Sequence, residues 1–533
     1  MEQGDCDDTS QSAAASRREY HKRATGRCAQ SRRNAMSATH PHHDFAFRSR
    51  PRSAGACIVI GTLIAAAACG GAAARDAETL PGRTRPLFEH KWLHPRDLEF
   101  SENRFTPPDS KSALVVTPSG LRAFVIPDTS ERVVQITAAI PLGRSFERMN
   151  EIGAAELLSR LLSQQISDRL GPAFVGRVQT DQDVDLTRFT LRVLAEDWQP
   201  ALTALLLALR QPRLDGAAID AYRTGAGFAR QTRGLGGPAF RPSVELARML
   251  ATHPLAPPDP GLTVRREAIH DFALRSLRPS AVTIGIGGGV TRDSVQRELQ
   301  SLTAGWRTPA AAAGLVTAAG VGKATSDRFR TIDEPGYTTW IAAGHPMPTT
   351  PPADEAAVAV MTEILNIRLN ISTREIRGLA NATQLQVTGT IRHDGLLHVR
   401  SGARPESVAP IIHFSLQELA RIREPGGAPT GDELEQVKGG LVFGKWQGTL
   451  DGARDASATY ASEAARFGSL DRLMKWPQAV RAVTAEDVGA VARKYVHPEI
   501  MGTVVIGQID KVRQARHPRW PVALDDLMAA ARR

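Results

Sequence analysis

The segment from 153 to 162 has the clearest helical pattern in the chain. Its leucines recur at intervals of three and four residues, so one stripe of the helix is buried. Three polar residues, Glu156, Ser159 and Arg160, share a neighbouring face of the same helix. Polar side chains that share one face of a helix are placed to hold a ligand together. We therefore take this face as the first candidate for a functional site.

Three strands are predicted upstream of this helix. Residues 113–116 and 121–126 are mostly apolar, and Pro118-Ser119-Gly120 forms a turn between them. A third apolar stretch covers 133–140 and leads to Gly143-Arg144-Ser145. The first half of the chain therefore opens with strands that lead into a helix.

The chain runs through one pattern twice. Residues 268–287 contain a short helix, then Pro279, then an apolar strand that ends in glycine. Residues 482–507 repeat this order around Pro498. The repetition predicts two tandem units of similar structure.

The first half resembles the entry into the insulinase or pitrilysin family of zinc peptidases. The resemblance consists of a Ser-Gly-Leu-Arg strand, an apolar strand that ends in Gly-Arg-Ser, and a helix that begins with Gly-x-x-x-Leu-Leu. In that family the helix carries the inverted motif His-x-x-Glu-His. Aligned with the motif, the first His falls on Glu156, the Glu on Ser159 and the second His on Arg160.

None of these replacements suits zinc chemistry. The family's site needs two imidazoles, a distal carboxylate and an activated water. Arg160 keeps its positive charge, and Ser159 cannot act as a base near neutral pH. The distal Glu is also missing, because no Glu lies between Glu196 and Glu245. We therefore expect no metal and no zinc cofactor, and Glu156 with Arg160 has the spacing of a helix-surface ion pair.

The second half contributes a further match to the family. Arg368-Leu369 precedes residues 374–381, which lead into an alternating strand at 384–390. The resemblance implies that Arg374 and a following Tyr hold the substrate backbone, but Asn381 occupies the Tyr position. An Arg followed by Glu at a helix end is equally typical of a solvated charge pair. Arg374 and Asn381 are thus the candidate substrate-binding residues.

The resemblance covers about 113–510 and implies the fold. Each unit of the family is an α+β domain, in which helices pack on one face of a mostly antiparallel sheet. We expect two such domains in tandem. The expected boundaries are 1–69 for a leader, 70–110 for a tether, 111–306 for the N-terminal domain, 307–327 for a linker, 328–510 for the C-terminal domain and 511–533 for a tail.

The first 69 residues have the character of a bacterial leader. All four cysteines lie there, at Cys6, Cys28, Cys57 and Cys69. Three arginines precede an apolar run at 54–68, which is too short for a comfortable membrane span and is typical of a signal peptide. The run ends in Ala66-Ala67-Ala68-Cys69-Gly70, which resembles a lipobox with lipid attachment at Cys69. The alternatives are ordinary secretion after an Ala-x-Ala site, and translation that starts at Met36 instead of Met1.

Composition narrows the functional classes. The chain has 533 residues, 42% hydrophobic and 5% aromatic, and a net charge of +10. The leader contains ten Lys or Arg and six Asp or Glu, so a mild positive excess without a basic cluster remains in the rest. This does not favour nucleic-acid binding.

Two other patterns have plain interpretations. The run Gly285-Ile286-Gly287-Gly288-Gly289 lacks the spacing of a dinucleotide-binding motif, so we expect a turn. His393 and His398 are expected on opposite arms of a hairpin, as surface histidines.

The sequence as a whole predicts an exported pseudopeptidase. By resemblance, it would be the non-catalytic partner of a zinc-bearing homologue, in a heterodimer or a homodimer that grips a peptide and is anchored by lipid in the bacterial envelope. Two rival hypotheses stay open. One is a stand-alone binding protein for a peptide or an envelope partner. The other is an active peptidase with a rebuilt site, for which Glu156 is the only carboxylate of the motif helix.

Overall fold

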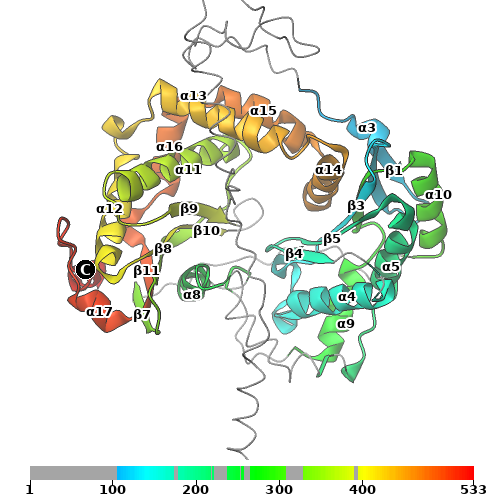
Figure 1. Ribbon diagram of the computed structural model, residues 1–533, viewed down its shortest axis with the longest axis horizontal. Helices are drawn as coiled ribbons and strands as arrows, with labels where there is room; N and C mark the ends of the chain where they lie inside the picture. Colours follow the sequence, from blue (N-terminus) through cyan, green and yellow to red (C-terminus); the bar gives the residue numbers. More distant parts are fainter. Residues whose placement is uncertain are drawn as a thin grey trace, which may run out of the picture. The chain divides into compact units, whose positions relative to one another are not determined.

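Two β-sheets organise the part of the chain that the structure describes (Figure 1). The structure is a computed structural model. It describes residues 105–172, 174, 178–217, 219–220, 237–251, 254–256, 264–307, 328–388 and 394–532. The predicted leader with Cys69, most of the tether and all but one residue of the predicted linker lie outside these ranges.

The first sheet has the strand order β1-β2-β6-β3-β5-β4. Neighbouring strands are antiparallel except β2 and β6, which are parallel. The strands are β1 Leu114–Val116, β2 Arg122–Pro127, β3 Val133–Ile140, β4 Gln179–Gln182, β5 Thr187–Leu194 and β6 Thr283–Gly288. The three strands predicted upstream of the motif helix are therefore confirmed.

The second sheet has the order β7-β11-β8-β10-β9, and only the β7–β11 pair is parallel. Its strands are β7 Phe329–Asp333, β8 Thr339–Met347, β9 Thr383–Thr388, β10 Gly395–Ala403 and β11 Gly502–Gly507. A short helix precedes the buried strand in each half, α9 before β6 and α16 before β11. The repeat predicted from the sequence, and the α+β class of two tandem domains, are confirmed.

In each half, helices from that same half pack on one face of the sheet. The first has α4 Ala154–Leu170, α5 Trp198–Arg210, α9 Arg266–Ser276 and α10 Arg292–Thr303. The second has α11 Glu355–Asn370, α12 Val408–Arg421, α13 Gly431–Gly439, α15 Asp471–Ala482 and α16 Ala485–Tyr495. Both cores bury branched and aromatic side chains, as Ile136, Leu158 and Phe272 illustrate in the first. None of the described helices has the length and apolar character needed to cross a bilayer.

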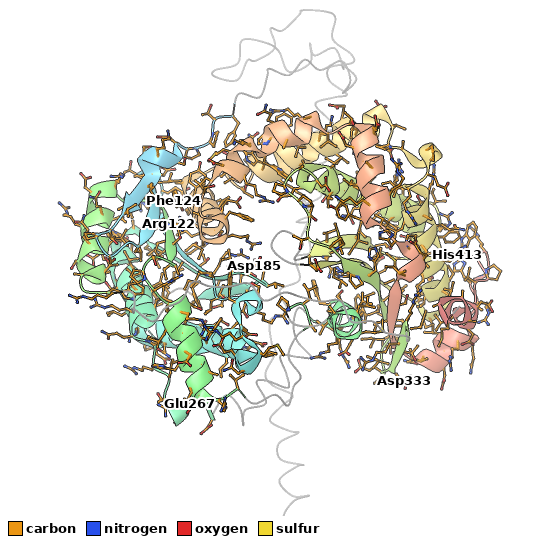
Figure 2. The ribbon with its side chains drawn as sticks, turned by 180° about the vertical axis from the view of Figure 1, so that it is seen from behind. Arg122, Phe124, Asp185, Glu267, Asp333 and His413 are labelled. Carbon is orange, nitrogen blue, oxygen red and sulfur yellow. The ribbon has the colours of Figure 1, made fainter. Side chains whose placement is uncertain are left out.

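The opposite face of each sheet is covered by one helix that comes from the other half of the chain. Helix α14 (Ala453–Phe467) packs on β2, β3 and β6, and α8 (Arg241–Leu250) packs on β8 and β11. In Figure 2, Arg122 and Phe124 of β2 lie beside α14. Arg122 donates to the carbonyl of Ala464 at 3.1 Å, and the Phe124 ring meets Tyr460 edge-on at 5.6 Å. The sheets thus have helices on both faces, which buries the strands β6 and β11 completely.

Glycines in β6 make room for α14. Gly285 and Gly287 lie inside this buried strand, and not in a turn as the sequence predicted. A Cβ at Gly287 would overlap the carbonyl oxygen of Ala453, and one at Gly285 would overlap that of Ser457. Gly288, with φ of 116°, ends the strand. The glycine-rich run therefore serves close packing between helix and sheet.

The described part of the predicted C-terminal tail, 511–532, is packed against the second domain. It contains the end of α17 (Ile509–Gln514) and all of α18 (Leu524–Arg532). Leu524 and Met528 of α18 join the hydrophobic cluster formed with α12. This segment, assigned in the sequence to a tail, thus extends the core.

Candidate functional site

A buried carboxyl fixes the start of the motif helix α4. Glu147 is only 2% exposed, and its Oε1 accepts hydrogen bonds from the backbone N–H groups of Gly153 (3.1 Å) and Ala155 (2.7 Å). These groups belong to the unpaired donors of a helix N-terminus. Burial nevertheless raises the pKa of Glu147 to about 8. At neutral pH the protonated form of this carboxyl is therefore favoured.

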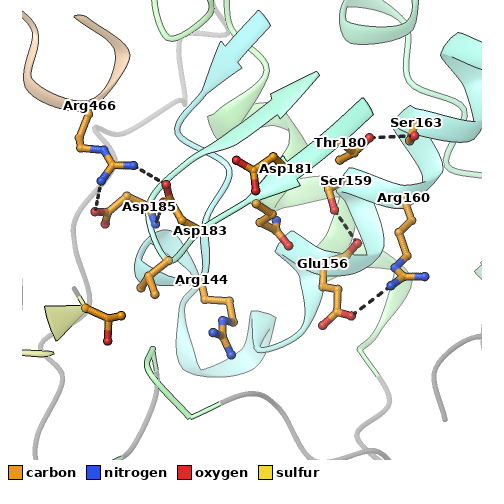
Figure 3. A pocket seen from close by; sticks show the side chains of 13 residues that line it. Arg144, Glu156, Ser159, Arg160, Ser163, Thr180, Asp181, Asp183, Asp185 and Arg466 are labelled. Atoms are coloured by element: carbon orange, nitrogen blue, oxygen red, sulfur yellow. Dashed lines mark hydrogen bonds and ion pairs between the residues drawn. The ribbon is translucent and has the colours of Figure 1, made fainter. Parts of the chain in front are cut away.

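The three motif positions interact with one another (Figure 3). Arg160 lies 3.8 Å from the carboxylate of Glu156, and the Ser159 hydroxyl donates to the Glu156 carbonyl at 2.8 Å. The ion pair predicted from the spacing is present, but Glu156 is buried and not on an open helix surface. Burial raises the pKa of Glu156, while Arg160 and Arg144 oppose the rise.

These side chains do not fit zinc. Two guanidinium groups, Arg160 and Arg144, act on the carboxylate of Glu156, and guanidinium cannot deprotonate to bind a metal. Glu245, at the end of the segment where the family's distal Glu is expected, pairs with Arg248 (2.8 Å) and Arg330 (3.2 Å). In the described ranges, no three His, Cys, Asp or Glu side chains are grouped so as to hold a metal ion.

A pocket of about 680 Å³ lies between α4 and β4, and we call it the α4–β4 pocket (Figure 3). Its walls are Arg144, Glu156, Ser159, Arg160, Ser163, Thr180, Asp181, Gln182, Asp183, Val184, Asp185, Thr388 and Arg466. Most of the charged groups are paired: Glu156 pairs with Arg160 in the wall, and Asp183 pairs with Arg466 in the wall and with Arg188 outside it. The Ser145 hydroxyl donates to Asp185 at 2.7 Å. The pocket is polar, and its charges largely compensate one another.

The strand β4 forms one edge of the first sheet, and no strand of the described chain pairs with its outer side. The amide of Asp183 donates to Leu186 at the β4–β5 turn. Because hydrogen-bonded pairs alternate along an antiparallel ladder, the backbone groups of Thr180 and Gln182 point away from β5. The hydroxyl of Thr180 bonds to that of Ser163 at 2.9 Å, so α4 contacts β4 through side chains here.

The corresponding edge of the second sheet is closed. The side chain of Asn366 on α11 bonds to both backbone groups of Leu385 in β9, accepting from N–H at 2.7 Å and donating to C=O at 3.3 Å. Asn370, one turn later, bonds to Thr383 in the same way, at 3.2 and 2.9 Å. The two amides take the place of a neighbouring strand along β9.

The two predicted substrate-binding residues lie away from the α4–β4 pocket. The side chain of Arg374 is 59% exposed and lies 3.4 Å from the carboxylate of Glu375, as expected for a solvated charge pair. Asn381 is exposed, and neither residue lines the pocket. Their role in binding stays a prediction. Arg377, three residues after Arg374, is held by an aromatic contact: its guanidinium stacks 3.8 Å from the centre of the Phe414 ring.

Arg466 is a wall residue that the sequence did not identify. It comes from α14 and bonds to Asp183, which lies 283 residues earlier in the chain. No local pattern connects such distant positions.

His398 corrects a further prediction. It is 3% exposed on β10, and neither ring nitrogen has a hydrogen-bond partner among the described residues. Burial lowers its pKa to about 4, so the ring is neutral at physiological pH. The sequence analysis expected it on the surface, because the alternation of polar and apolar residues along the strand does not show that α8 covers this face of the sheet. His393 lies outside the described residues.

Comparison with known proteins identifies the fold. The family described as the peptidase M16 inactive domain matches residues 263–441. No curated protein matches the chain in sequence.

Solved structures match most of the chain. The peptidase M16 inactive domain from Pseudomonas fluorescens has a TM-score of 0.61 at 19% identity, covering 76% of this chain and 98% of that one. A protease from Helicobacter pylori has a TM-score of 0.63 at 16% identity, covering 74% and 98%. The first half of the periplasmic protease PqqL from Escherichia coli has a TM-score of 0.59 at 16% identity, covering 80% and 98%. The resemblance read from the sequence is thus confirmed: residues 263–441 match the M16 inactive-domain family, and the described part of the chain has the fold of M16-like structures.

Proposed function

We propose that this chain is an exported, peptide-binding pseudopeptidase that acts as the non-catalytic partner of a zinc-bearing homologue. One observation carries the proposal. The open edge of β4 adjoins a pocket in which the motif positions hold an ion pair instead of metal ligands. The site has kept a place for a peptide and lacks the groups that would cut it.

An extended peptide fits the open edge because an unpaired strand offers backbone donors and acceptors. The outward backbone groups of Thr180 and Gln182 would pair with the peptide backbone. Alternate peptide side chains would then point into the α4–β4 pocket. Its compensated charges favour polar segments without a strong preference for one sign.

The half-length match to PqqL supports a partner chain. This chain covers 51% of the complete PqqL, so a second chain of similar size would supply what the other half supplies there. The partner would carry the zinc and this chain would contribute peptide-holding walls. The alternative is a stand-alone binding protein, which would hold peptide at the same edge without any homologue.

An envelope location is part of the proposal. PqqL is described as periplasmic, and the leader of this chain ends in a lipobox-like sequence at Cys69. Lipid attachment at Cys69 would hold the protein at a membrane. Cys69→Ser should then move the mature protein from the membrane fraction to the soluble fraction.

Two substitutions at one position test peptide binding at β4. Thr180→Pro removes an outward N–H that the ladder with β5 does not use, so the fold should persist. Thr180→Val keeps this N–H and loses only the bond to Ser163. In fluorescence anisotropy with a labelled unstructured peptide, we expect the proline variant to bind about tenfold more weakly or worse, and the valine variant to bind nearly as wild type.

Equal binding by both variants would remove β4 from the site. Absence of peptide binding by the full chain, alone and with its zinc-bearing homologue, would overturn the proposed function. Light scattering of the two chains together separates the partner model from the stand-alone model. One zinc per chain with chelator-sensitive cleavage by the pure protein would instead establish an active peptidase with a rebuilt site.

A further inference from the structure

We propose that the bound peptide continues past β4 along α14 and places an aromatic side chain in a separate hollow formed by Phe467 and Trp476. The inference rests on the proposed function, because it concerns the same peptide. It assigns a second recognition site and a preferred class of side chain.

The hollows along this path share wall residues. A groove of about 700 Å³ runs along α14, and we call it the α14 groove. It shares Asp181 and Arg466 with the α4–β4 pocket. It shares Phe467 and Arg472 with a third space of about 500 Å³, the aromatic hollow. The three spaces therefore follow one another as neighbours.

Helix α14 has the right two faces for such a path. Its small and aromatic residues, such as Ala456 and Tyr460, are buried on the first sheet. Residues at intervals of three and four on the other side, from Asp455 through Thr459 and Ser462, line the groove. The groove meets the α4–β4 pocket at Arg466 and the aromatic hollow at Phe467, so both junctions lie at the C-terminal end of the helix.

The aromatic hollow is built around one arginine. The guanidinium carbon of Arg472 lies 4.8 Å from the centre of the Phe467 ring and 5.7 Å from that of Trp476. The same guanidinium pairs with Glu355 at 2.6 Å and with Glu463 at 3.3 Å. These contacts fix both rings and compensate the positive charge.

A large neutral side chain suits this hollow. Its volume lies within the usual range for small-ligand sites of about 300–1,000 Å³. Its walls combine the rings of Phe467 and Trp476 and small aliphatic residues with charged side chains of both signs. Lys475 and Asp471 carry opposite charges at the wall, so neither sign of ligand charge is preferred. Inside the hollow a charged peptide side chain would lose hydration, since Arg472 is already paired with Glu355 and Glu463 and the other two charged groups, Asp471 and Lys475, are exposed. Phe, Tyr or Trp would gain contact with both rings.

A peptide series tests the inference on the full chain. The peptides are identical except at one position, which is Phe, Ala or Glu, and binding is measured by fluorescence anisotropy. With wild-type protein we expect the Phe peptide to bind about ten- to a hundredfold more tightly than the Ala peptide. In Trp476→Ala this ratio should fall to near one. Tyr337→Ala is the control, because Tyr337 is 99% exposed and does not line the hollow.

A second variant keeps the test decisive if Trp476→Ala does not fold. Ala479 lines the hollow from the exposed side of α15, so Ala479→Phe should fill the space without removing any packing, and should also abolish the preference for Phe. An unchanged Phe-to-Ala ratio in a folded variant would overturn the aromatic hollow. Equal binding of all three peptides by the wild type would also overturn it and leave the proposed function standing, whereas binding of none would overturn both.

Discussion

The two domains repeat one plan and differ at the edge strand beside their longest helices. In the second domain, Asn366 and Asn370 bond to the backbone of β9 and close the edge. In the first, α4 contacts β4 through a Thr180–Ser163 hydroxyl pair, and the outer backbone groups stay available. An open edge invites another chain to pair, and proteins usually block it. The difference leaves an unpaired edge only in the first of these two described places, and this is the edge at which we propose that a peptide binds.

The exchanged helices show a second difference. Helix α14 touches β6 at glycines, backbone against backbone, whereas α8 packs on side chains of β11 such as Val504 and Ile506. The space between sheet and covering helix is thus closed differently in the two domains. In the first the backbones approach each other closely, and in the second branched side chains fill the space. The first contact depends on the absence of side chains, so it should be less tolerant of substitution.

Two carboxyls with shifted pKa values also distinguish the domains. Burial raises the pKa of Glu147 in the first domain to about 8. In the second domain, hydrogen bonds from Arg368 lower the pKa of Glu433 to about 2, with smaller contributions from Thr430. The contributions of Glu147 and Glu433 to stability should therefore change with pH in opposite directions.

The largest expected effect is on the α14 contact. Gly287→Val would drive a branched side chain into the backbone of α14 at Ala453. We expect a loss of about 3 kcal/mol or more in the free energy of unfolding, at the upper end for overpacked cores. The matched change in β11, Ile506→Val, should cost only about 0.5–1.5 kcal/mol. Chemical denaturation measures both, and equal losses would contradict the distinction between the two contacts.

A second prediction concerns pH. The folded-state pKa of Glu147 is about 8, against an ordinary value of 4.5. Its contribution to stability is therefore fully present below pH 4.5 and is lost as pH rises through 8, by on the order of a few kcal/mol. Glu147→Gln keeps an oxygen acceptor for Gly153 and Ala155 and removes the titration. Stability curves of wild type and variant should diverge above pH 4.5, and parallel curves would show that Glu147 does not titrate in this way.

Glu433 gives the contrasting control. Its pKa is lowered, so its contribution is present above pH 4.5 and is lost as pH falls towards 2. Glu433→Gln should therefore alter stability at neutral pH and have little effect near pH 2. If Glu433→Gln changed stability in the same direction and over the same pH range as Glu147→Gln, the contrast between the domains would be contradicted.

The smallest predicted effect compares the two edges directly. Asn366→Ala removes the partner of both Leu385 backbone groups, and should cost about 1–3 kcal/mol and speed exchange of the Leu385 amide hydrogen. Ser163→Ala on α4 loses one exposed hydroxyl bond and should cost less than about 0.5 kcal/mol. Hydrogen exchange and denaturation measure both. If Ser163→Ala were as costly, α4 would be holding β4 as firmly as α11 holds β9.

The sequence alone determined several local elements, the repeat and the resemblance to the peptidase family. Helical spacing in the motif segment gave α4, apolar runs gave β1 to β3, and the repeated helix–Pro–strand pattern gave the two domains. The residue types at positions 156, 159 and 160 were enough to exclude the family's zinc ligands there. These features depend on neighbours within about one element, where period and residue chemistry act directly.

Only the tertiary structure decided the surroundings of the site. The exchange of α8 and α14, the Arg466–Asp183 pair and the burial of His398 all join residues far apart in the chain. The sequence interpreted Gly285 and Gly287 as a turn because a glycine that admits a helix looks the same as one that bends the backbone. Whether an edge strand is open or closed likewise depends on which side chains from another element reach its backbone, and no local pattern encodes that contact.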